Sequence, residues 1–182
     1  ETICIGADLV GLKPFSVSHD QAAALALTTL TAMIALEDTA HLAAGQRLLV
    51  QGGAGGVGSI GIQIAHHIGA HVITTASPGN HDYVTGLGAD EVINYNETED
   101  IAQAVMDMTG GRGVDVCIEM VGGKVLQQSL AALCLNGRLS TCGAHAGEKV
   151  EMDMIEFFRK QITMTSCHFA PKSTNTTVLS LI

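Results

Sequence analysis

The chain has 182 residues, a length that suits one ordinary domain with a complete hydrophobic core. Hydrophobic residues make up 47% of it, glycines number 21 and prolines three, which is typical of a soluble α/β protein and not of a disordered or collagen-like chain. The formal net charge is −9 with only nine Lys and Arg residues, which argues against nucleic acid or an anionic membrane as the main partner.

The first forty residues lie outside the pattern that the rest of the chain follows. A helix is predicted from a cap at Ser18 or Asp20 to about His41. The apolar run within it, residues 22–36, is shorter than the roughly 20 residues that a membrane-spanning helix needs, so we expect a buried helix. Because the chain begins with Glu1 instead of Met, we expect it to be an excised piece of a longer protein.

From residue 47 onward, short apolar runs alternate with segments of helical character, which indicates a parallel sheet with crossover helices. Strands are predicted at 47–52, 71–76, 91–95, 114–121, 137–143 and 162–168. Helices are predicted at 57–69, 80–87, 97–109, 123–134 and 153–160, and Gly69, Gly88 and Gly137 stand just beyond three of them. The prediction is an α/β, doubly wound Rossmann fold with six parallel strands, and right-handed crossovers favour the strand order 3-2-1-4-5-6.

The glycine-rich stretch "QGGAGGVGSIG", residues 51–61, joins the first predicted strand to the next helix. Its residues Gly53, Gly55 and Gly58 satisfy G-x-G-x-x-G in the context that this motif requires. The first glycine permits a tight turn, the second lets the backbone approach a pyrophosphate, and the third lets the helix pack close to the strand. The helix N-terminus offers free N–H groups to phosphates, so the motif predicts a dinucleotide site.

Other glycine-rich folds are disfavoured at identifiable positions. A P-loop would need a phosphate-binding lysine where this chain has Ser59. A short-chain dehydrogenase would carry Tyr-x-x-x-Lys, but Leu87 follows Tyr83 at that distance and Glu99 follows Tyr95. A methyltransferase and a plain strand-to-helix turn without a ligand stay open as alternatives.

The end of the second predicted strand distinguishes NAD from NADP. An NAD site places Asp or Glu there to bind the ribose 2′-hydroxyl group, whereas this chain has Ala76 and Ser77. A small hydroxyl side chain leaves room for a 2′-phosphate and does not repel it, so NADP is favoured over NAD. The nearest basic partner for that phosphate is His81, beside the unfavourable Asp82.

The segments "AAGQRLLVQGGAGGVGSIGIQIAHHIGAHVITTAS", "LGADEVINY" and "VGGKVLQQSLAALCLNGRLSTCGAHAGE" resemble the coenzyme-binding half of the medium-chain dehydrogenase/reductase superfamily. The similarity is to its quinone-oxidoreductase and zinc-type alcohol-dehydrogenase-like branch. It implies a reductase that passes a hydride from NADPH to a small carbonyl, quinone or enone. It also implies that residues 1–17 are a remnant of the catalytic domain, that residues 18–182 form the NAD(P)-binding domain with its lead-in helix, and that the isolated piece is inactive.

The resemblance implies cofactor contacts on the phosphate side of the dinucleotide. Gly56 and Val57 would present backbone N–H groups to the pyrophosphate. Ser77 and Tyr95 would flank the adenosine 2′-phosphate, with His81 as a weaker candidate.

On the nicotinamide side, the same resemblance implies Val121 and Gly122 near the ribose, and Gly143 and Ala144 near the ring. Thr31, in the helix that leads into the domain, matches a threonine that approaches this side of the cofactor. The catalytic residues stay unknown, because the resemblance places the catalytic domain outside this chain.

Zinc is not expected in this segment. The zinc-dependent branch carries a cysteine ligand at about Leu25 to Leu27, and this chain has no Cys, His, Asp or Glu between Gln21 and Leu36. The resemblance therefore favours a zinc-independent oxidoreductase. The alternatives are a zinc-dependent alcohol dehydrogenase and a non-catalytic dinucleotide-binding protein.

The remaining histidines and carboxylates are expected to be structural. His67 and His71 are four residues apart, but Gly69 separates the helix of one from the strand of the other, so no metal is predicted. Asp115 and Glu119 fall on the fourth predicted strand, where Glu119 is expected to be a solvated or hydrogen-bonded carboxylate.

The five cysteines are scattered, without a CxxC pair, and are expected to be reduced and to fill core positions in a cytoplasmic protein. They are Cys4, Cys117, Cys134, Cys142 and Cys167. The last predicted strand, "ITMTSCHF", is an apolar sheet edge, so a homodimer through this strand is expected.

Overall fold

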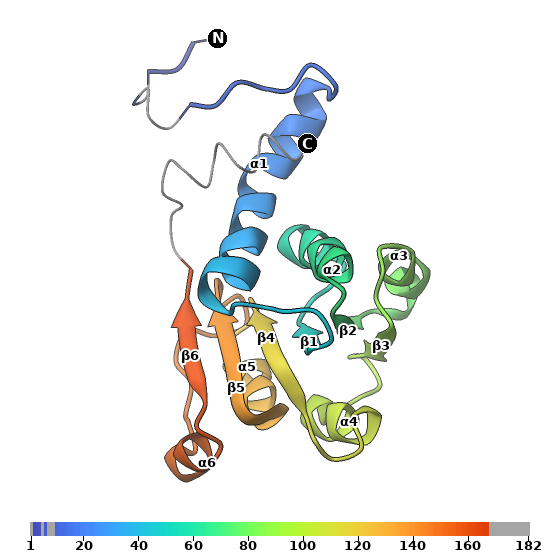
Figure 1. Cartoon of the computed structure of the whole chain (residues 1–182), viewed down its shortest axis with the longest axis vertical. Helices are drawn as coiled ribbons and strands as arrows, with labels where there is room; N and C mark the ends of the chain where they lie inside the picture. Colours follow the sequence, from blue (N-terminus) through green and yellow to red (C-terminus); the bar gives the residue numbers. More distant parts are fainter. Residues whose placement is uncertain (1, 5, 7–9, 168–182) are drawn as a thin grey trace.

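The computed structural model describes residues 2–4, 6 and 10–167 (Figure 1). Its sheet is formed by β1 (Arg47–Val50), β2 (His71–Ala76), β3 (Glu91–Asn94), β4 (Val114–Glu119), β5 (Leu133–Thr141) and β6 (Thr163–Ser166). The helices are α1 (His19–Met33), η2 (Ile34–Thr39), α2 (Gly56–Ile68), η3 (Pro78–Asn80), α3 (His81–Gly86), α4 (Ile101–Met108), α5 (Gly123–Ala131) and α6 (Met154–Arg159).

All six strands are parallel, and their order is β3-β2-β1-β4-β5-β6. The predicted fold class and the predicted strand order are confirmed. The chain proceeds outward from β1 to β3 on one side and returns to place β4 against the other side of β1. The C-terminal ends of β1 and β4 therefore form the switch point at which doubly wound sheets bind their ligands.

Helices cover both faces of the sheet, with α2 and α3 on one side and α4 and α5 on the other (Figure 1). The first core combines η2, α2 and α3 with strand residues such as Leu48, Val50 and Val116. The second combines α4 and α5 with residues of the opposite parity, such as Leu49 and Cys117. Alternating strand side chains thus enter two separate cores, which explains the continuous apolar runs of the sequence.

The lead-in helix starts where it was predicted. The Ser18 hydroxyl accepts from the Gln21 N–H at 3.1 Å and the Gln21 side chain accepts from the Ser18 N–H at 2.9 Å, a complete capping box. The helix continues without interruption through the π-helical segment η2 and ends at Thr39, just before His41, whose φ is 49°.

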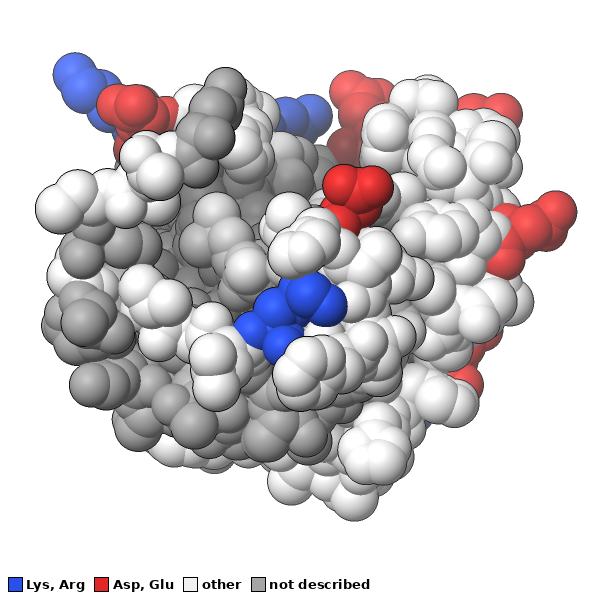
Figure 2. All heavy atoms as spheres, turned by 90° about the horizontal axis from the view of Figure 1, so that it is seen from above, with Lys and Arg blue, Asp and Glu red and all other residues white. Residues whose placement is uncertain are grey.

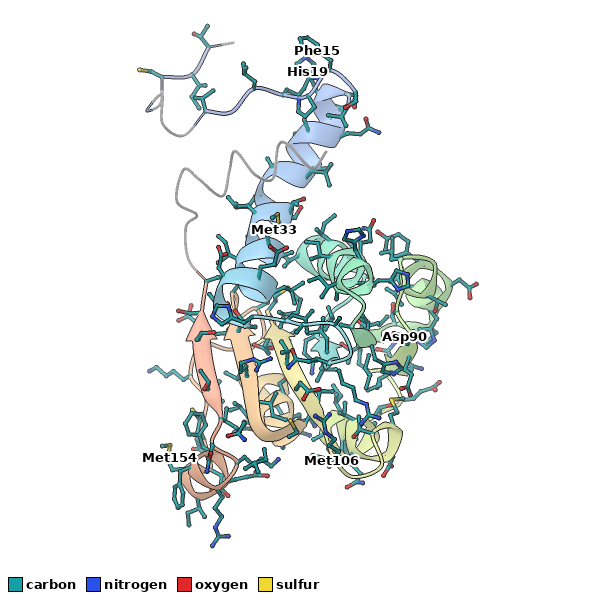
Figure 3. The ribbon with its side chains drawn as sticks, viewed as in Figure 1. Phe15, His19, Met33, Asp90, Met106 and Met154 are labelled. Atoms are coloured by element: carbon teal, nitrogen blue, oxygen red, sulfur yellow. The ribbon has the colours of Figure 1, made fainter. Side chains whose placement is uncertain are left out.

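The prediction that this helix is buried is wrong for most of α1. No residue of α1 before Leu30 is buried, and Leu27 is 73% exposed. Phe15 and His19 lie far from the sheet while Met33 lies where the helix meets it (Figure 3). The cause is that α1 rises beyond the edge of the sheet, where the described part of the chain offers no surface to pack against.

The apolar helix is longer than the run from which a membrane span was excluded, because α1 and η2 together form a continuous helix of 21 residues from His19 to Thr39, with an 18-residue stretch of mean hydropathy 1.3. By length and composition such a helix could cross a membrane. Core helices of soluble proteins pass the same test, and the C-terminal turns of this helix are buried in the first core.

The segment that joins α5 to β5 differs from the prediction. The helix ends at Ala131 and the strand begins at Leu133, four residues before its predicted start, so Gly137 lies within β5 and does not end a helix. Leu133 is fully buried and pairs with Val114, and the Asn136 N–H donates to the carbonyl of Lys160 at 2.7 Å. These tertiary partners hold an apolar run in a strand that helical periodicity alone would continue as a helix.

Other boundaries shift by a few residues. The strands β1 and β4 end at Val50 and Glu119, two residues before their predicted ends, because the chain turns there into the loops of the switch point. The fourth long helix begins at Ile101 instead of residue 97, because the Asp100 side chain caps the N–H of Gln103 at 2.9 Å. The last strand was predicted to end at residue 168, but β6 ends at Ser166. Cys167 follows the strand, and His168 lies outside the described residues.

Candidate dinucleotide site

Two adjoining cavities open at the C-terminal ends of β1 and β4. The first, here called the loop cavity, encloses about 310 Å³ and is lined by the turn 55–58, by Val121 after β4 and by Cys142 after β5. The second, here called the outer cavity, encloses about 480 Å³ between β2, β3 and α5. The two cavities share Gln51, Gly52 and Val121, so they form one elongated site across the switch point.

The glycine turn is shaped by close contacts that a side chain would prevent. A Cβ atom on Gly53 would lie 2.1 Å from the Thr74 hydroxyl oxygen, and one on Gly58 would lie 2.3 Å from the carbonyl oxygen of Gly52. At Gly55 the nearest atom would be the carbonyl oxygen of Gly52 at 3.2 Å, a less severe contact, and Gly55 lines the loop cavity. The first and third glycines of the motif therefore serve packing, while the second faces the space where a ligand would lie.

Gly52 is a further glycine that the motif does not include. Its φ is 68°, in the left-handed region, and it lines both cavities. It reverses the chain after β1 and offers its carbonyl oxygen to the N–H of Gly55 at 3.0 Å.

Helix α2 begins directly at the loop cavity. Its N-cap is Gly55, which provides no side chain to cap the first N–H groups of the helix. Those groups have no acceptor within the helix, and the helix dipole adds a partial positive charge at the same place. The N-terminus of a 13-residue helix thus faces a cavity large enough for a pyrophosphate.

A buried hydrogen-bond network fixes the start of the glycine turn. Gln51 is 1% exposed. Its side-chain Nε2 donates to the Ser129 hydroxyl at 2.9 Å, and its side-chain Oε1 accepts from the Thr75 hydroxyl at 3.0 Å. The Thr75 oxygen also accepts from the N–H of Gly52 at 2.9 Å. The network ties β1 to β2 and α5, so it holds the turn at the centre of the two cavities.

Replacing Thr75 with valine keeps the shape of the side chain but removes both of these hydrogen bonds. Two buried polar groups, the Gly52 N–H and the Gln51 oxygen, lose their partner, so we expect a loss of about 1–3 kcal/mol in the free energy of unfolding. Urea denaturation measures this change. The control is Thr85→Val on the exposed face of α3, where a change within about 0.5 kcal/mol is expected; equal effects of the two substitutions would show that the network does not stabilise the turn.

Glu119, at the end of β4, shapes the second wall of the loop cavity. The carboxylate is fully buried, and its Oε1 accepts from the N–H groups of Val121 at 2.8 Å and Gly122 at 2.9 Å. Its Oε2 is buried without a hydrogen-bond partner in the described part of the chain. Burial raises the pKa of Glu119, against the opposing effect of the two N–H groups. The expectation of a hydrogen-bonded carboxylate is confirmed, and its role is to hold the turn after β4.

The turns after β4 and β5 are held against each other. A Cβ atom on Gly122 would lie 2.5 Å from the carbonyl oxygen of Gly147 and 2.8 Å from the Cα atom of Ala144. A Cβ atom on Gly143 would lie 2.7 Å from the carbonyl oxygen of Met120. The structure therefore brings together the residues predicted for the nicotinamide side, although Gly122, Gly143 and Ala144 themselves line neither cavity.

The residues predicted for the phosphate side divide into two groups. Those that line a cavity are Gly55, Gly56, Val57, Gly58 and Tyr95. Ser77 and His81 lie instead beyond the end of β2, where the Asn80 amide donates to the Ser77 hydroxyl at 3.0 Å. The Nε2 atom of His81 is buried and has no hydrogen-bond partner among the described residues.

The residue of α1 that lines the loop cavity is Thr28, not the predicted Thr31. Thr31 lines neither cavity, and its hydroxyl donates to the carbonyl of Leu27 at 2.9 Å. Thr28, one helical turn earlier, lines the loop cavity and meets Gly56, on which a Cβ atom would lie 2.8 Å from the Thr28 methyl group. The face of the helix that meets the loop depends on the crossing of α1 over α2, and no residue pattern indicated that crossing.

Besides Gly52, sequence analysis missed polar and charged side chains around the outer cavity and the far wall of the loop cavity. They are Gln51, Thr75, Thr98, Glu99, Lys124, Gln128 and His145. Only Gly52 had a local signal, as the first glycine of the glycine-rich stretch.

The described residues contain no group of three or more His, Cys, Asp and Glu side chains placed to hold a metal ion. The donors that a zinc centre needs are thus not gathered beside the loop cavity in the described ranges. His71 pairs instead with two carboxylates, at 3.5 Å from Asp90 and 2.8 Å from Glu91. Asp115 pairs with Arg112 and accepts from the N–H of Arg47 at 2.8 Å.

Comparison with known proteins identifies the family of the chain. The model of the zinc-binding dehydrogenase family matches residues 56–182. The hybrid PKS-NRPS synthetase pyvA of Aspergillus violaceofuscus is 37% identical over 164 residues, which cover 86% of this chain and 4% of that protein.

Solved structures agree with this match. The quinone oxidoreductase of Pseudomonas syringae pv. Tomato superposes with a TM-score of 0.84 at 31% identity, over 94% of this chain and 54% of that one. The CurK enoyl reductase superposes with a TM-score of 0.78 at 30% identity, over 97% of this chain and 53% of that one. The chain therefore spans about half the length of these oxidoreductases. It belongs to the zinc-binding dehydrogenase family, within the quinone-oxidoreductase and alcohol-dehydrogenase-like branch of the medium-chain dehydrogenases/reductases.

Proposed function

We propose that the chain is the NADP(H)-binding domain of an oxidoreductase that transfers a hydride between NADPH and a small carbonyl, quinone or enone. The observation that carries the proposal is the loop cavity, where the glycine turn and the N-terminus of α2 meet at the switch point of the sheet. The dinucleotide supplies the hydride when it is bound. The substrate would lie between this domain and a part of the protein outside the chain, in keeping with the chain's half-length match to related structures.

The residues of the chain would bind and orient the cofactor. The first N–H groups of α2, at Gly56 and Val57, would hold the pyrophosphate, and the network around Gln51 would keep the turn in place. The turn that Glu119 anchors would support the nicotinamide ribose beside Val121. Orientation of this kind is the main contribution that a protein makes to hydride transfer.

Ser77 supports NADP over NAD, because no carboxylate stands at the end of β2 to repel a 2′-phosphate. Its hydroxyl is already oriented by Asn80, and Tyr95 lines the neighbouring outer cavity. His81, with a buried Nε2 that lacks a partner in the described chain, is the basic group closest in sequence to Ser77.

Replacing Ser77 with aspartate tests the preference for NADP. We expect the dissociation constant for NADPH to rise at least about 10-fold, which corresponds to about 1.4 kcal/mol, while that for NADH changes little or falls. Fluorescence titration of the whole protein with both nucleotides measures the two constants. The control is Ser77→Ala, which removes the hydroxyl without adding charge; a parallel loss of both nucleotides in the aspartate variant would contradict the assignment.

Among the acceptors, an enone is favoured by the similarity to the CurK enoyl reductase and to a synthetase of the polyketide class. Oxidation of NADPH by the whole protein across a panel of quinones, enones and aldehydes tests the reaction. Turnover with at least one class is expected. NADPH binding without turnover of any of them would favour the alternative of a non-catalytic dinucleotide-binding protein.

We propose further that the reaction is independent of zinc. The zinc-dependent branch carries a cysteine ligand at about Leu25 to Leu27, and this chain has no metal-binding side chain there. The residue of this segment that lines the loop cavity is Thr28. Elemental analysis of the whole protein should find less than one tightly bound zinc per chain with full activity after chelation. Loss of activity on chelation, restored by zinc, would instead support an alcohol dehydrogenase of the zinc-dependent type.

The proposal extends to the other domain of the protein, its localisation and its oligomeric state. Residues 1–17 would belong to the catalytic domain, the protein would be cytoplasmic, and β6, the edge strand of the sheet, would pair with its twin in a homodimer. On the face shown in Figure 2, most of the surface formed by the described residues is neither acidic nor basic. Such a face supports a small-molecule substrate over nucleic acid as the partner.

A further inference from the structure

Two cysteines lie just beyond the ends of neighbouring strands, and one of them, Cys142, lines the loop cavity. Cys142 directly follows β5 and Cys167 directly follows β6, and the last register pair of these strands is Thr141 opposite Ser166. The parallel ladder extends one step further, because the Cys167 N–H donates to the carbonyl oxygen of Thr141 at 3.1 Å. Cys142 and Cys167 are therefore the next opposed pair.

Their place on adjacent strands suits a disulfide. Opposed residues on neighbouring strands point to the same face of a sheet, and such strands lie about 4.7–4.9 Å apart. A disulfide joins Cα atoms that are about 4.4–6.8 Å apart, so the ladder spacing falls within the range that a disulfide needs. Each thiol is the largest influence on the pKa of the other, as expected for two side chains that stand opposite each other on adjacent strands.

The environment gives the two thiols different chemical roles. Interaction with Cys142 lowers the pKa of Cys167, and interaction with Cys167, together with burial, raises the pKa of Cys142. Because the thiolate is the nucleophilic form, Cys167 is the more reactive member of the pair and Cys142 is held as the thiol.

The two thiols of this pair are more accessible to solvent than the other cysteines of the sheet. Cys142 and Cys167 are half-buried, and Cys142 lines the loop cavity. Cys117 and Cys134 are buried at 0% and 8% exposure, and burial raises the pKa of both. The expectation that the cysteines fill core positions is thus right for Cys117 and Cys134 and wrong for Cys4, which is exposed. Cys142 and Cys167 are partly buried, and Cys167 packs against the first core.

We propose that Cys142 and Cys167 are a redox-modification site that closes to a disulfide when a hydroperoxide reacts with the protein. The Cys167 thiolate attacks a peroxide oxygen, the O–O bond breaks, and the sulfur is oxidised to a sulfenic acid while water or an alcohol leaves. The Cys142 sulfur then attacks the Cys167 sulfur, so that the S–S bond forms and the S–O bond breaks. The departing hydroxide takes the Cys142 proton and leaves as water. A dithiol reverses the reaction by thiol–disulfide exchange.

The sequence makes the disulfide directly measurable. Tryptic cleavage places Cys142 in the peptide 139–149 and Cys167 in the peptide 161–172, each with a single cysteine. The whole protein is treated with equimolar hydrogen peroxide, its free thiols are blocked with N-ethylmaleimide, and it is digested without reduction for mass spectrometry. We expect the two peptides joined, two hydrogens lighter than their sum, and released by dithiothreitol.

Matched variants keep the test decisive. Cys142→Ser should abolish the joined peptides and leave a Cys167 sulfenic acid that dimedone traps, whereas Cys167→Ser should leave Cys142 alkylated. Cys134→Ser, at a buried cysteine outside the pair, should leave the joined peptides unchanged. Recovery of both wild-type peptides as alkylated thiols after peroxide treatment would overturn the proposal, as would a Cys167 linked to any other cysteine. Far-UV circular dichroism confirms that each variant is folded.

Discussion

Replacing Gly58 with alanine is expected to weaken NADPH binding by about 10- to 100-fold and to destabilise the domain by about 1–3 kcal/mol. The added Cβ atom would lie 2.3 Å from the carbonyl oxygen of Gly52 and 2.9 Å from the Cα atom of Gly53. Both neighbours are backbone atoms, so neither can rotate away. Either the start of α2 or the turn after β1 must move.

The binding loss follows from where that movement occurs. Gly52 and Gly58 both line the loop cavity, and the first N–H groups of α2 lie between them along the chain. A shift of the turn therefore displaces the groups that would hold the pyrophosphate, whatever molecule accepts the hydride. Calorimetric titration with NADPH and urea denaturation of the same variant measure the two effects.

The matched control is Gly86→Ala. Gly86 lies at the end of α3, with nothing within 4 Å of an added Cβ atom and no left-handed φ. This substitution should leave NADPH affinity unchanged and should be neutral or slightly stabilising, because alanine favours a helix more than glycine does. If Gly58→Ala bound NADPH as well as the control, the role assigned to the third glycine would be wrong.

Replacing Glu119 with alanine is expected to lower the free energy of unfolding by about 2–6 kcal/mol, since one buried and one partly buried N–H group lose their acceptor at about 1–3 kcal/mol each. Those groups belong to Val121 and Gly122, in the turn that borders both cavities. Glu119→Gln keeps an oxygen acceptor at the same place and removes the charge, so it should retain most of the stability.

The glutamine variant also tests the ionisation of this residue. Burial raises the pKa of Glu119 in the folded protein, so the folded state holds the proton more tightly than the unfolded state does. The contribution of this group to stability is therefore full below the unfolded pKa, near 4.5, and is lost as the pH rises through the folded pKa. The stability of the wild type minus that of Glu119→Gln should fall as the pH rises above 4.5. A constant difference from pH 4 to pH 8 would show that Glu119 titrates alike in both states.

The fold was predictable because burial of both sheet faces leaves a strong signal in the sequence. Runs such as 71–76 are apolar throughout, and the structure places that strand at the predicted residues, His71–Ala76. The strand order could not be read from the sequence itself; it is the usual order of a doubly wound sheet with right-handed crossovers, and the structure has it. Gly69 ended α2 as predicted, with a φ of 88° in the left-handed region.

The errors lie where tertiary contacts outweigh local preference. Leu133 has helical neighbours in the sequence, but its pairing with Val114 places it in a strand. The first turns of α1 have the composition of a buried helix, yet they extend beyond the sheet.

In the candidate site, too, the local features were predictable and the contacts between distant residues were not. The glycine turn is contiguous in sequence, so its spacing could be read directly. The network of Gln51, Thr75 and Ser129 joins residues that are 24 and 78 positions apart, and the thiol pair joins the ends of two strands. Only the sheet register brings such residues together, and no single-residue pattern records that register.

Calorimetric titration of the whole protein with NADPH and with NADH tests most directly whether the switch point of this sheet binds NADP(H). We expect one saturable NADPH site per chain, with affinity at least about 10-fold above that for NADH, a difference of about 1.4 kcal/mol. Gly58→Ala should weaken that site and Gly86→Ala should not. Absence of binding for both nucleotides would contradict the account.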